Sequence, residues 1–163
     1  MAKAKQRLAT KDGPAQRIIK STPINEGAAY LIRVAYLALR RMLQKNLAAH
    51  QVTIGVWYYL WALWEKDGLN QRELSERTGI KQANTTVVLR TMRRDGLIRR
   101  ARDAKDRRNF KIFITANGRK LKDEIAHCGI EGNLAAMDGF SAREVKQVQA
   151  LLKRIVRNVE PAL

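Results

Sequence analysis

The sequence has a single cysteine, Cys128, and only two histidines, His50 and His127. One cysteine excludes an intramolecular disulfide framework and is typical of a reducing compartment. The sequence contains no Cys/His cluster with the spacing of metal ligands, so we expect no metal and no cofactor. The carboxylates form no acid–base pair and the glycines no phosphate-binding loop, which argues against an enzyme.

Long apolar runs are also missing. The longest charge-free stretch lies between Lys45 and Glu65, and polar residues interrupt its first part. The strongly apolar remainder, residues 52–64, is shorter than a membrane span and predicts a buried helix. The basic residues 1–7 are followed by no apolar segment, so a secretory signal is not expected and we predict a cytoplasmic protein.

Acidic residues are scarce, because 15 Asp and Glu stand against 32 Lys and Arg, a net charge of +17 over 163 residues. The excess is concentrated in residues 71–108, which carry a net charge of +7, and in residues 1–23, which carry +5. A concentrated positive field is typical of proteins that bind a polyanion, with nucleic acid ahead of an anionic membrane surface. The apolar content of 45% is enough for one folded domain.

The expected organisation is a flexible basic arm over residues 1–23, followed by a single domain over residues 24–163. The arm has no apolar periodicity, and it either solubilises the chain or lies along DNA. Apolar spacing then predicts a helix over about 25–48. Thr53 can cap a second helix, apolar on nearly all sides, which ends at Asp67.

Two short helices across a glycine turn follow. Asn70 and Glu73 resemble a capping box that opens the first of them, and Gly79 supplies the turn that ends it. The second helix is expected over about 81–94, with a buried stripe of Thr85, Val88, Leu89 and Met92. This arrangement is a helix-turn-helix pattern.

A change of apolar period from 3.6 to 2 after Gly96 predicts a basic β-hairpin over about 98–114. Thr115 restarts a helix, and three glycines predict a loose connection after it, in which Cys128 would lie. The fold class is therefore expected to be mainly α with a small β-hairpin wing. It would combine a winged helix-turn-helix over about 53–115 with a helical dimerisation region over about 25–48 and 116–160.

The last helix is expected to begin at Ser141, which forms a second capping-box match with Glu144. Its apolar residues recur at alternating spacings of three and four, which is typical of a seam that faces a partner helix. The residues of this predicted dimer seam are Val145, Val148, Leu152, Ile155 and Val159.

The outward face of the helix over 81–94 predicts DNA contacts. In a major groove glutamine can pair with adenine, arginine with guanine, and threonine with base edges or a thymine methyl group. We therefore expect Gln82, Thr86 and Arg90 to contact bases. Residues at the helix ends are better placed for phosphates, and these are Lys81 and Asn84, with Arg93 and Arg94 as further candidates.

Three blocks around the hairpin occur in a fixed order and spacing. They are Gly96-Leu97-Ile98-Arg99-Arg100, Asp103-Ala104-Lys105-Asp106-Arg107-Arg108, and Phe113-Ile114-Thr115-Ala116-Asn117-Gly118. They resemble the wing of the MarR family, the bacterial multiple-antibiotic-resistance-type regulators, with Ile114 in place of leucine. The resemblance covers roughly residues 25–158.

The resemblance implies a homodimer in which the first and last two helices interlock and two winged lobes read a pseudo-palindromic site. It implies that Arg107 or Arg108 enters the minor groove and that Asp106 braces the wing by pairing with an arginine, which agrees with the preference of arginine for narrow minor grooves. Val87 stands where relatives often carry a polar or basic residue, so a known recognition sequence is not transferred. Cys128 does not match the cysteine position of the family's oxidant-sensing branch, which favours a core residue.

The resemblance also implies a small-molecule effector that binds between the dimerisation helices and the DNA-binding lobe. The residues that could line such a pocket are Tyr30, Arg33, Arg40, Trp57, Tyr58 and Trp61. A tryptophan stripe of this kind is more often part of the core, and a row of arginines is usually a solvated helix face. An aromatic acid or an acyl-CoA thioester is the expected effector class.

These observations predict a bacterial transcription regulator that binds double-stranded DNA as a homodimer, as a repressor released by a small ligand. The alternative is a non-specific nucleoid or RNA-binding basic protein without an effector. A defined footprint would separate the two, because a non-specific binder protects no particular site.

Overall fold

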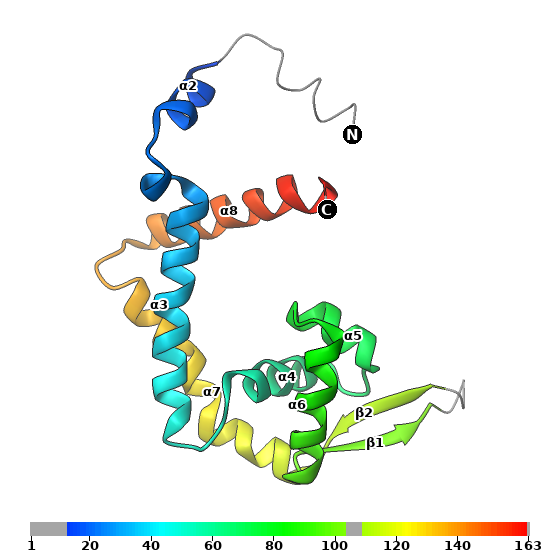
Figure 1. Ribbon diagram of the computed structural model, residues 1–163. Coiled ribbons are helices and arrows are strands. Elements are labelled where there is room, and N and C mark those ends of the chain that lie inside the picture. The colour runs from blue at the N-terminus through cyan, green and yellow to red at the C-terminus, as the bar shows by residue number, and fades with distance from the viewer. Residues whose placement is uncertain (1–12, 104–108, 163) are drawn as a thin grey trace. The chain divides into compact units, whose positions relative to one another are not determined.

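The computed structural model describes residues 13–103 and 109–162 of the chain (Figure 1). The chain divides into two compact units, of which the first ends at Ala38 and the second begins at Leu39. The first unit contains α2 (Pro14–Ser21), the 3-10 turn η1 (Ile24–Glu26) and the first part of α3 (Ala28–Ala48). The helix expected over about 25–48 is thus confirmed as α3.

Helix α2 corrects the sequence prediction of an irregular arm through residue 23. Pro14 occupies the first turn, where a missing N–H costs nothing. The N–H of Gly13 donates to Gln16 Oε1 at 2.7 Å, and the hydroxyl of Thr22 donates to the carbonyl of Ile18 at 2.7 Å. These local caps stabilise a short helix that has too few turns to show a clear period. The other arm residues, 1–12, lie outside the described part of the chain.

The second unit contains the rest of α3 and the winged helix-turn-helix. Its further elements are α4 (Ile54–Glu65), α5 (Gln71–Thr78), α6 (Gln82–Arg94), β1 (Ile98–Arg102), β2 (Phe110–Ile114), α7 (Ala116–Ala136), α8 (Ala142–Val159) and η2 (Glu160–Ala162). The predicted fold class, mainly α with a small β-hairpin, is confirmed. In the described residues no helix is long and apolar enough to cross a membrane.

Helix α4 supplies much of the core of this unit. The hydroxyl of Thr53 accepts a hydrogen bond from the N–H of Val56 at 3.3 Å, which confirms the predicted cap. Six of its residues are buried, and these are Val56, Trp57, Tyr59, Leu60, Ala62 and Leu63. Helices α5, α6 and α7 and strand β2 all contact α4, so the functional elements are attached to one apolar helix.

The hairpin pairs β1 and β2 in antiparallel register, with Ile98 opposite Ile114 and Arg102 opposite Phe110. Ile98, Ile112 and Ile114 are buried, as the period of two predicted. An additional bridge joins Leu69 to Ile112, which ties the hairpin to the segment between α4 and α5.

Helix α7 corrects a second prediction. It continues through Gly129 and Gly132 to Ala136, so Cys128 lies within a helix and not in a loose connection. A Cβ atom at Gly129 would stand 2.7 Å from Cζ2 of Trp57, so glycine allows close packing of α7 on α4 there. The chain turns only after Met137, where Gly139 adopts a φ of +77°.

Helix α8 begins as predicted. The Ser141 hydroxyl accepts from the N–H of Glu144 at 3.3 Å, and the Glu144 carboxylate accepts from the N–H of Ser141 at 2.8 Å. None of its residues is buried. The seam residues Leu152, Ile155 and Val159 are 43%, 38% and 50% exposed in the single chain.

Candidate nucleic-acid interface

Helix α6 is anchored through its inner face. Thr85 is fully buried and its hydroxyl accepts a hydrogen bond from the hydroxyl of Tyr59 at 2.8 Å. The same hydroxyl donates to the carbonyl of Lys81 at 3.2 Å, so the polar groups of the contact are satisfied. Leu89 and Met92 complete the buried stripe, and Val88 is half-buried. The predicted inner face of α6 is thereby confirmed.

The outer face of α6 is exposed over its length. The exposed residues are Lys81, Gln82, Ala83, Asn84, Thr86, Val87 and Arg90. Val87 is the apolar member of this surface, with 61% of its area exposed. The base-contact and phosphate candidates of the sequence analysis on this helix, Arg93 and Arg94 included, are therefore all exposed.

The turn before α6 is built as the sequence predicted. Asn70 and Glu73 form a reciprocal capping box, with Asn70 Oδ1 accepting from the Glu73 N–H at 2.9 Å and Glu73 Oε2 accepting from the Asn70 N–H at 2.7 Å. Gly79 ends α5 with a φ of +67°, a conformation that glycine adopts without strain. These local contacts fix the start of α6 relative to α5.

Gln71 lies in the groove beside α6 and contacts Thr86, which the sequence analysis does not predict. Its Nε2 donates a hydrogen bond to Oγ1 of Thr86 at 2.7 Å, which joins the first turn of α5 to the outer face of α6. This bond positions the hydroxyl of Thr86, one of the predicted base contacts. No signal in the sequence marks the pair, because the two residues meet only through the packing of α5 on α6.

A groove of about 650 Å³ lies between these helices and the hairpin. Besides Arg72 of α5, three arginines line it, Arg90 and Arg93 from α6 and Arg100 from β1. The guanidinium of Arg100 lies 3.7 Å from the ring centre of Phe110, a cation–π contact that holds the charge on the hairpin face. Three positive side chains around one concave surface favour binding of a phosphate backbone.

Two further arginines near the groove are engaged in ion pairs. Arg94 Nε lies 2.9 Å from Oδ1 of Asp95, so this candidate phosphate contact already has an acidic partner. Arg72, which also lines the groove, lies 2.8 Å from Oε1 of Glu76. The hydrogen bond and the charge of Glu76 raise the pKa of Arg72.

The wing tip residues Asp106, Arg107 and Arg108 lie outside the described part of the chain, so the predicted minor-groove contact and brace stay predictions. At the outer end of the two strands, Lys111 Nζ lies 3.3 Å from Oδ2 of Asp103. The N–H of Asp103 donates to the carbonyl of Asn109 at 2.9 Å. The two strands are therefore held together by side chains as well as by their ladder.

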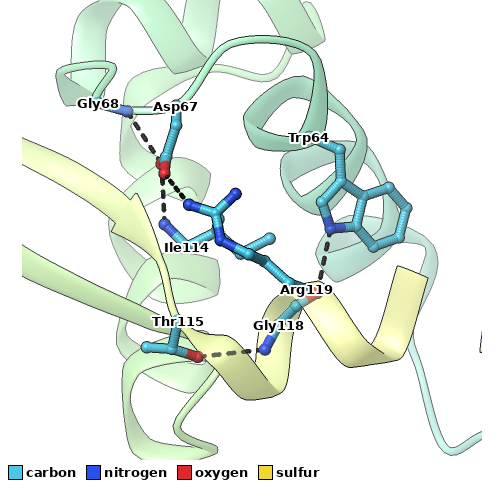
Figure 2. Close-up of polar contacts among 7 residues, drawn as sticks. All are labelled: Trp64, Asp67, Gly68, Ile114, Thr115, Gly118 and Arg119. Carbon is cyan, nitrogen blue, oxygen red and sulfur yellow. Dashed lines mark hydrogen bonds and ion pairs between the residues drawn. The ribbon is translucent and has the colours of Figure 1, made fainter. Parts of the chain in front are cut away.

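A polar joint connects the hairpin to α7 and α4 (Figure 2). Oδ1 of Asp67 accepts from the N–H of Gly68 at 3.0 Å and of Ile114 at 2.9 Å, and its Oδ2 lies 2.6 Å from Nη2 of Arg119. Nearby, the indole N–H of Trp64 donates to the carbonyl of Gly118 at 3.1 Å. The hairpin and the segment after α4 are thus fixed to the first turn of α7.

The predicted effector residues fall into both units. Tyr30 and Arg33 belong to the first unit, whereas Arg40, Trp57, Tyr58 and Trp61 belong to the second. Trp57 is 6% exposed and packs edge-on against Trp64, with ring centres 5.8 Å apart, so it is a core residue. Trp61 is 46% exposed and is the tryptophan of the stripe whose ring a ligand can reach.

Comparison with known proteins finds both similar sequences and similar folds. Residues 52–110 match the model of the MarR family. The HTH-type transcriptional regulator TtmR of Methylorubrum extorquens (strain PA1) is 33% identical over 96 residues, which is 59% of this chain and 49% of TtmR. The chain thus matches about half the length of that relative, whose description as a transcriptional regulator agrees with the expectation that the chain is not an enzyme.

Two solved structures share the fold at low sequence identity. BpsR of Bordetella bronchiseptica, whose DNA binding is regulated by 6-hydroxynicotinic acid, has a TM-score of 0.76 and 22% identity and covers 82% of this chain and 96% of its own. CouR of Rhodococcus jostii RHA1, bound to p-coumaroyl-CoA, has a TM-score of 0.74 and 22% identity and covers 83% of this chain and 95% of its own.

Proposed function

Because this chain belongs to the MarR family, we propose that it is a transcription regulator that binds a specific DNA site as a homodimer and represses until a small ligand releases it. One observation carries the proposal. The face of α6 that bears Gln82, Thr86 and Arg90 is exposed, while its opposite face is buried and hydrogen-bonded through Thr85 to Tyr59. A helix held in this way presents a rigid row of polar side chains at the width of a major groove.

Electrostatics support the same surface. The groove beside α6 is lined by Arg90, Arg93 and Arg100, which would hold the phosphates that flank the base contacts. Residues 71–108 carry the largest local excess of positive charge in the chain. Backbone contacts of this kind strengthen binding to any sequence, whereas the α6 face would supply the discrimination.

The first test is footprinting on the DNA that flanks the protein's own gene, at near-physiological salt. We expect a palindromic footprint with half-sites about one helical turn apart. Arg90→Ala should weaken binding to that site by about 5- to 150-fold and leave binding to random DNA nearly unchanged, since a bidentate base contact contributes about 1–3 kcal/mol of discrimination. Arg143→Ala, which removes an exposed arginine of α8, is the control for net charge.

Equal losses for Arg90→Ala on cognate and random DNA would assign that residue to the backbone. Uniform, salt-sensitive protection without a preferred site would replace the proposal with the non-specific nucleoid or RNA-binding protein. Gln71→Ala serves as a second variant, because it removes only the bond that positions the hydroxyl of Thr86. Its loss of affinity should be smaller than that of Thr86→Ala and confined to the cognate site.

The effector part of the proposal rests on Trp61 and on the ligands named for the two fold relatives, an aromatic acid and an aromatic acyl-CoA. A ligand releases DNA only if it binds the DNA-free conformation more tightly, by a coupling of about 1–3 kcal/mol. The footprint is therefore repeated with aromatic acids and acyl-CoA thioesters. Trp61→Ala should abolish release by the active compound and keep the footprint, whereas release that survives Trp61→Ala would remove this residue from the pocket.

A further inference from the structure

The fold brings together three side chains that the sequence keeps apart. His50 lies in the turn after α3, whereas His127 and Cys128 are neighbours in α7. The Sγ atom of Cys128 is 3.7 Å from Nε2 of His127, and one ligand atom from each of the three residues lies within 4.8 Å of the other two. All three residues belong to the second unit. The spacing of the residues along the chain gives no sign of this cluster.

We propose that His50, His127 and Cys128 bind a zinc ion, which ties the turn after α3 to the middle of α7. Two imidazole nitrogens and a thiolate are preferred ligands of Zn²⁺. With Zn–N bonds of about 2.0–2.1 Å and Zn–S bonds of about 2.3 Å, neighbouring ligands of a tetrahedral site stand roughly 3.3–3.8 Å apart. The distance between Cys128 and His127 meets this requirement, and His50 needs to approach by no more than about 1.5 Å.

The cluster combines a buried thiol with two imidazoles that solvent can reach. Cys128 is 1% exposed, whereas the side chain of His127 is 52% exposed and His50 is half-buried. Gln51, with a φ of +56°, and the bond from the His50 N–H to the carbonyl of Leu47 shape the turn that carries His50. An ion can therefore reach the two imidazoles first and the thiol last.

We assign the fourth ligand to Glu131, whose carboxylate must move closer to His50 and Cys128 than it lies in this structure. It follows His127 by one helical turn, and its Oε1 lies 3.9 Å from Nε2 of His127. Its other oxygen accepts a hydrogen bond from Nδ2 of Asn46 at 2.8 Å, which holds the carboxylate beside the cluster. One carboxylate and one thiolate balance the two positive charges of Zn²⁺, so the occupied site carries no net charge.

Zinc binding at this site displaces the proton of the Cys128 thiol. On binding, the S–H bond breaks, the proton passes to solvent and the sulfur electron pair forms the Zn–S bond. The site is independent of the proposed DNA contacts, which lie on α6 and the hairpin.

The test uses the full-length protein freed of metal with a chelator. Equilibrium dialysis with metal analysis should find one zinc per chain, and Zn²⁺ but not Mg²⁺ should raise the unfolding temperature. Co²⁺ in place of Zn²⁺ should give a thiolate-to-metal charge-transfer band and the d–d bands of tetrahedral coordination. His50→Gln, His127→Gln and Cys128→Ser should each lower zinc affinity by about 100-fold or more, and Glu131→Gln by about 10- to 100-fold.

Asp138→Asn is the control, because it removes an exposed carboxylate beyond the end of α7. Circular dichroism checks that each variant is folded. His50 and His127 reach the surface, so their variants keep the test valid if the buried Cys128→Ser variant unfolds. The proposal is overturned if the wild type gives no thiolate band with Co²⁺, or if the zinc affinity of His50→Gln and His127→Gln equals that of the wild type.

Discussion

Arg119 and Asp67, 52 positions apart in the chain, form an ion pair in which Nη2 and Oδ2 are 2.6 Å apart. The pair joins the first turn of α7 to the end of α4, and the second oxygen of Asp67 accepts the N–H of Ile114, the last residue of the hairpin. One carboxylate thus holds three elements together. This joint therefore links α7 directly to the last residue of the hairpin.

The two partners of this joint should contribute unequally to stability. Arg119→Ala should lower the free energy of unfolding by less than about 1 kcal/mol, because its side chain is 60% exposed and exposed ion pairs contribute little. Asp67→Ala should cost about 1–3 kcal/mol, since it leaves the N–H of Ile114 without its acceptor. Urea unfolding of both variants and the wild type measures the difference. Equal losses would mean that the ion pair, not the backbone contact, is the main contribution of Asp67.

The glycines of α7 should respond to alanine in opposite directions. A Cβ at Gly118 would overlap the carbonyl of Leu97 and stand 2.7 Å from Cγ1 of Ile114, so Gly118→Ala should destabilise by about 1–3 kcal/mol. Gly132→Ala meets no atom within 4 Å among the described residues and should stabilise the helix by about 0.5–1 kcal/mol. Unfolding of the two variants in urea compares them directly, and a stabilising Gly118→Ala would contradict the close packing of α7 on the hairpin.

Features set by neighbouring residues were predictable from the sequence. The caps at Thr53, Asn70 and Ser141 are each formed by bonds across three residues, so a short motif specifies them. The hairpin and the buried stripe of α6 follow from apolar period for the same reason. Gly129 and Gly132 have low helix propensity and so predict a loose connection, whereas in the structure α7 continues through both and Trp57 leaves no room for a side chain at Gly129.

Contacts between distant segments were not predictable. Gln71 meets Thr86, and His50 meets Cys128, only after the helices have packed, and neither pair has a sequence spacing that marks it. The outward residues of α6 were found because helical period alone assigns them a face. The partners that position those residues required the structure.

Acid should weaken the start of α8. The hydroxyl and then the N–H of Ser141, which donate to Oε2 of Glu144, lower the pKa of that carboxyl. A carboxyl with a lowered pKa in the folded state stabilises the fold above its unfolded-state pKa, and the contribution is lost as pH falls through the folded value. Glu144→Gln should therefore be less stable than the wild type at pH 7, with the difference shrinking as pH falls below about 4.

Urea midpoints of wild type and Glu144→Gln from about pH 7 to 3 measure this effect. Glu124→Gln, which removes an exposed carboxylate of α7, corrects for the change in net charge. If the difference in stability between wild type and Glu144→Gln stayed constant over this pH range, Ser141 would not favour the charged form of Glu144.

The apolar seam of α8 gives the sharpest prediction about assembly. Leu152 and Ile155 are 43% and 38% exposed in the single chain, although a helix with no buried residue gains little from apolar side chains unless a partner covers them. Sedimentation equilibrium should find a dimer for the wild type and a monomer when both residues are replaced by glutamate. Affinity for a palindromic site should then fall by about 100-fold or more, because the two half-sites are no longer bound together.

The control adds the same charge to the other side of the helix. Gln147→Glu combined with Ala150→Glu places two glutamates at exposed positions away from the seam, so this variant should remain dimeric and keep its DNA affinity. A dimer that persists in the Leu152→Glu, Ile155→Glu variant would move the interface off α8. Dissociation of both double variants would instead show that negative charge on α8, rather than loss of the apolar seam, separates the chains.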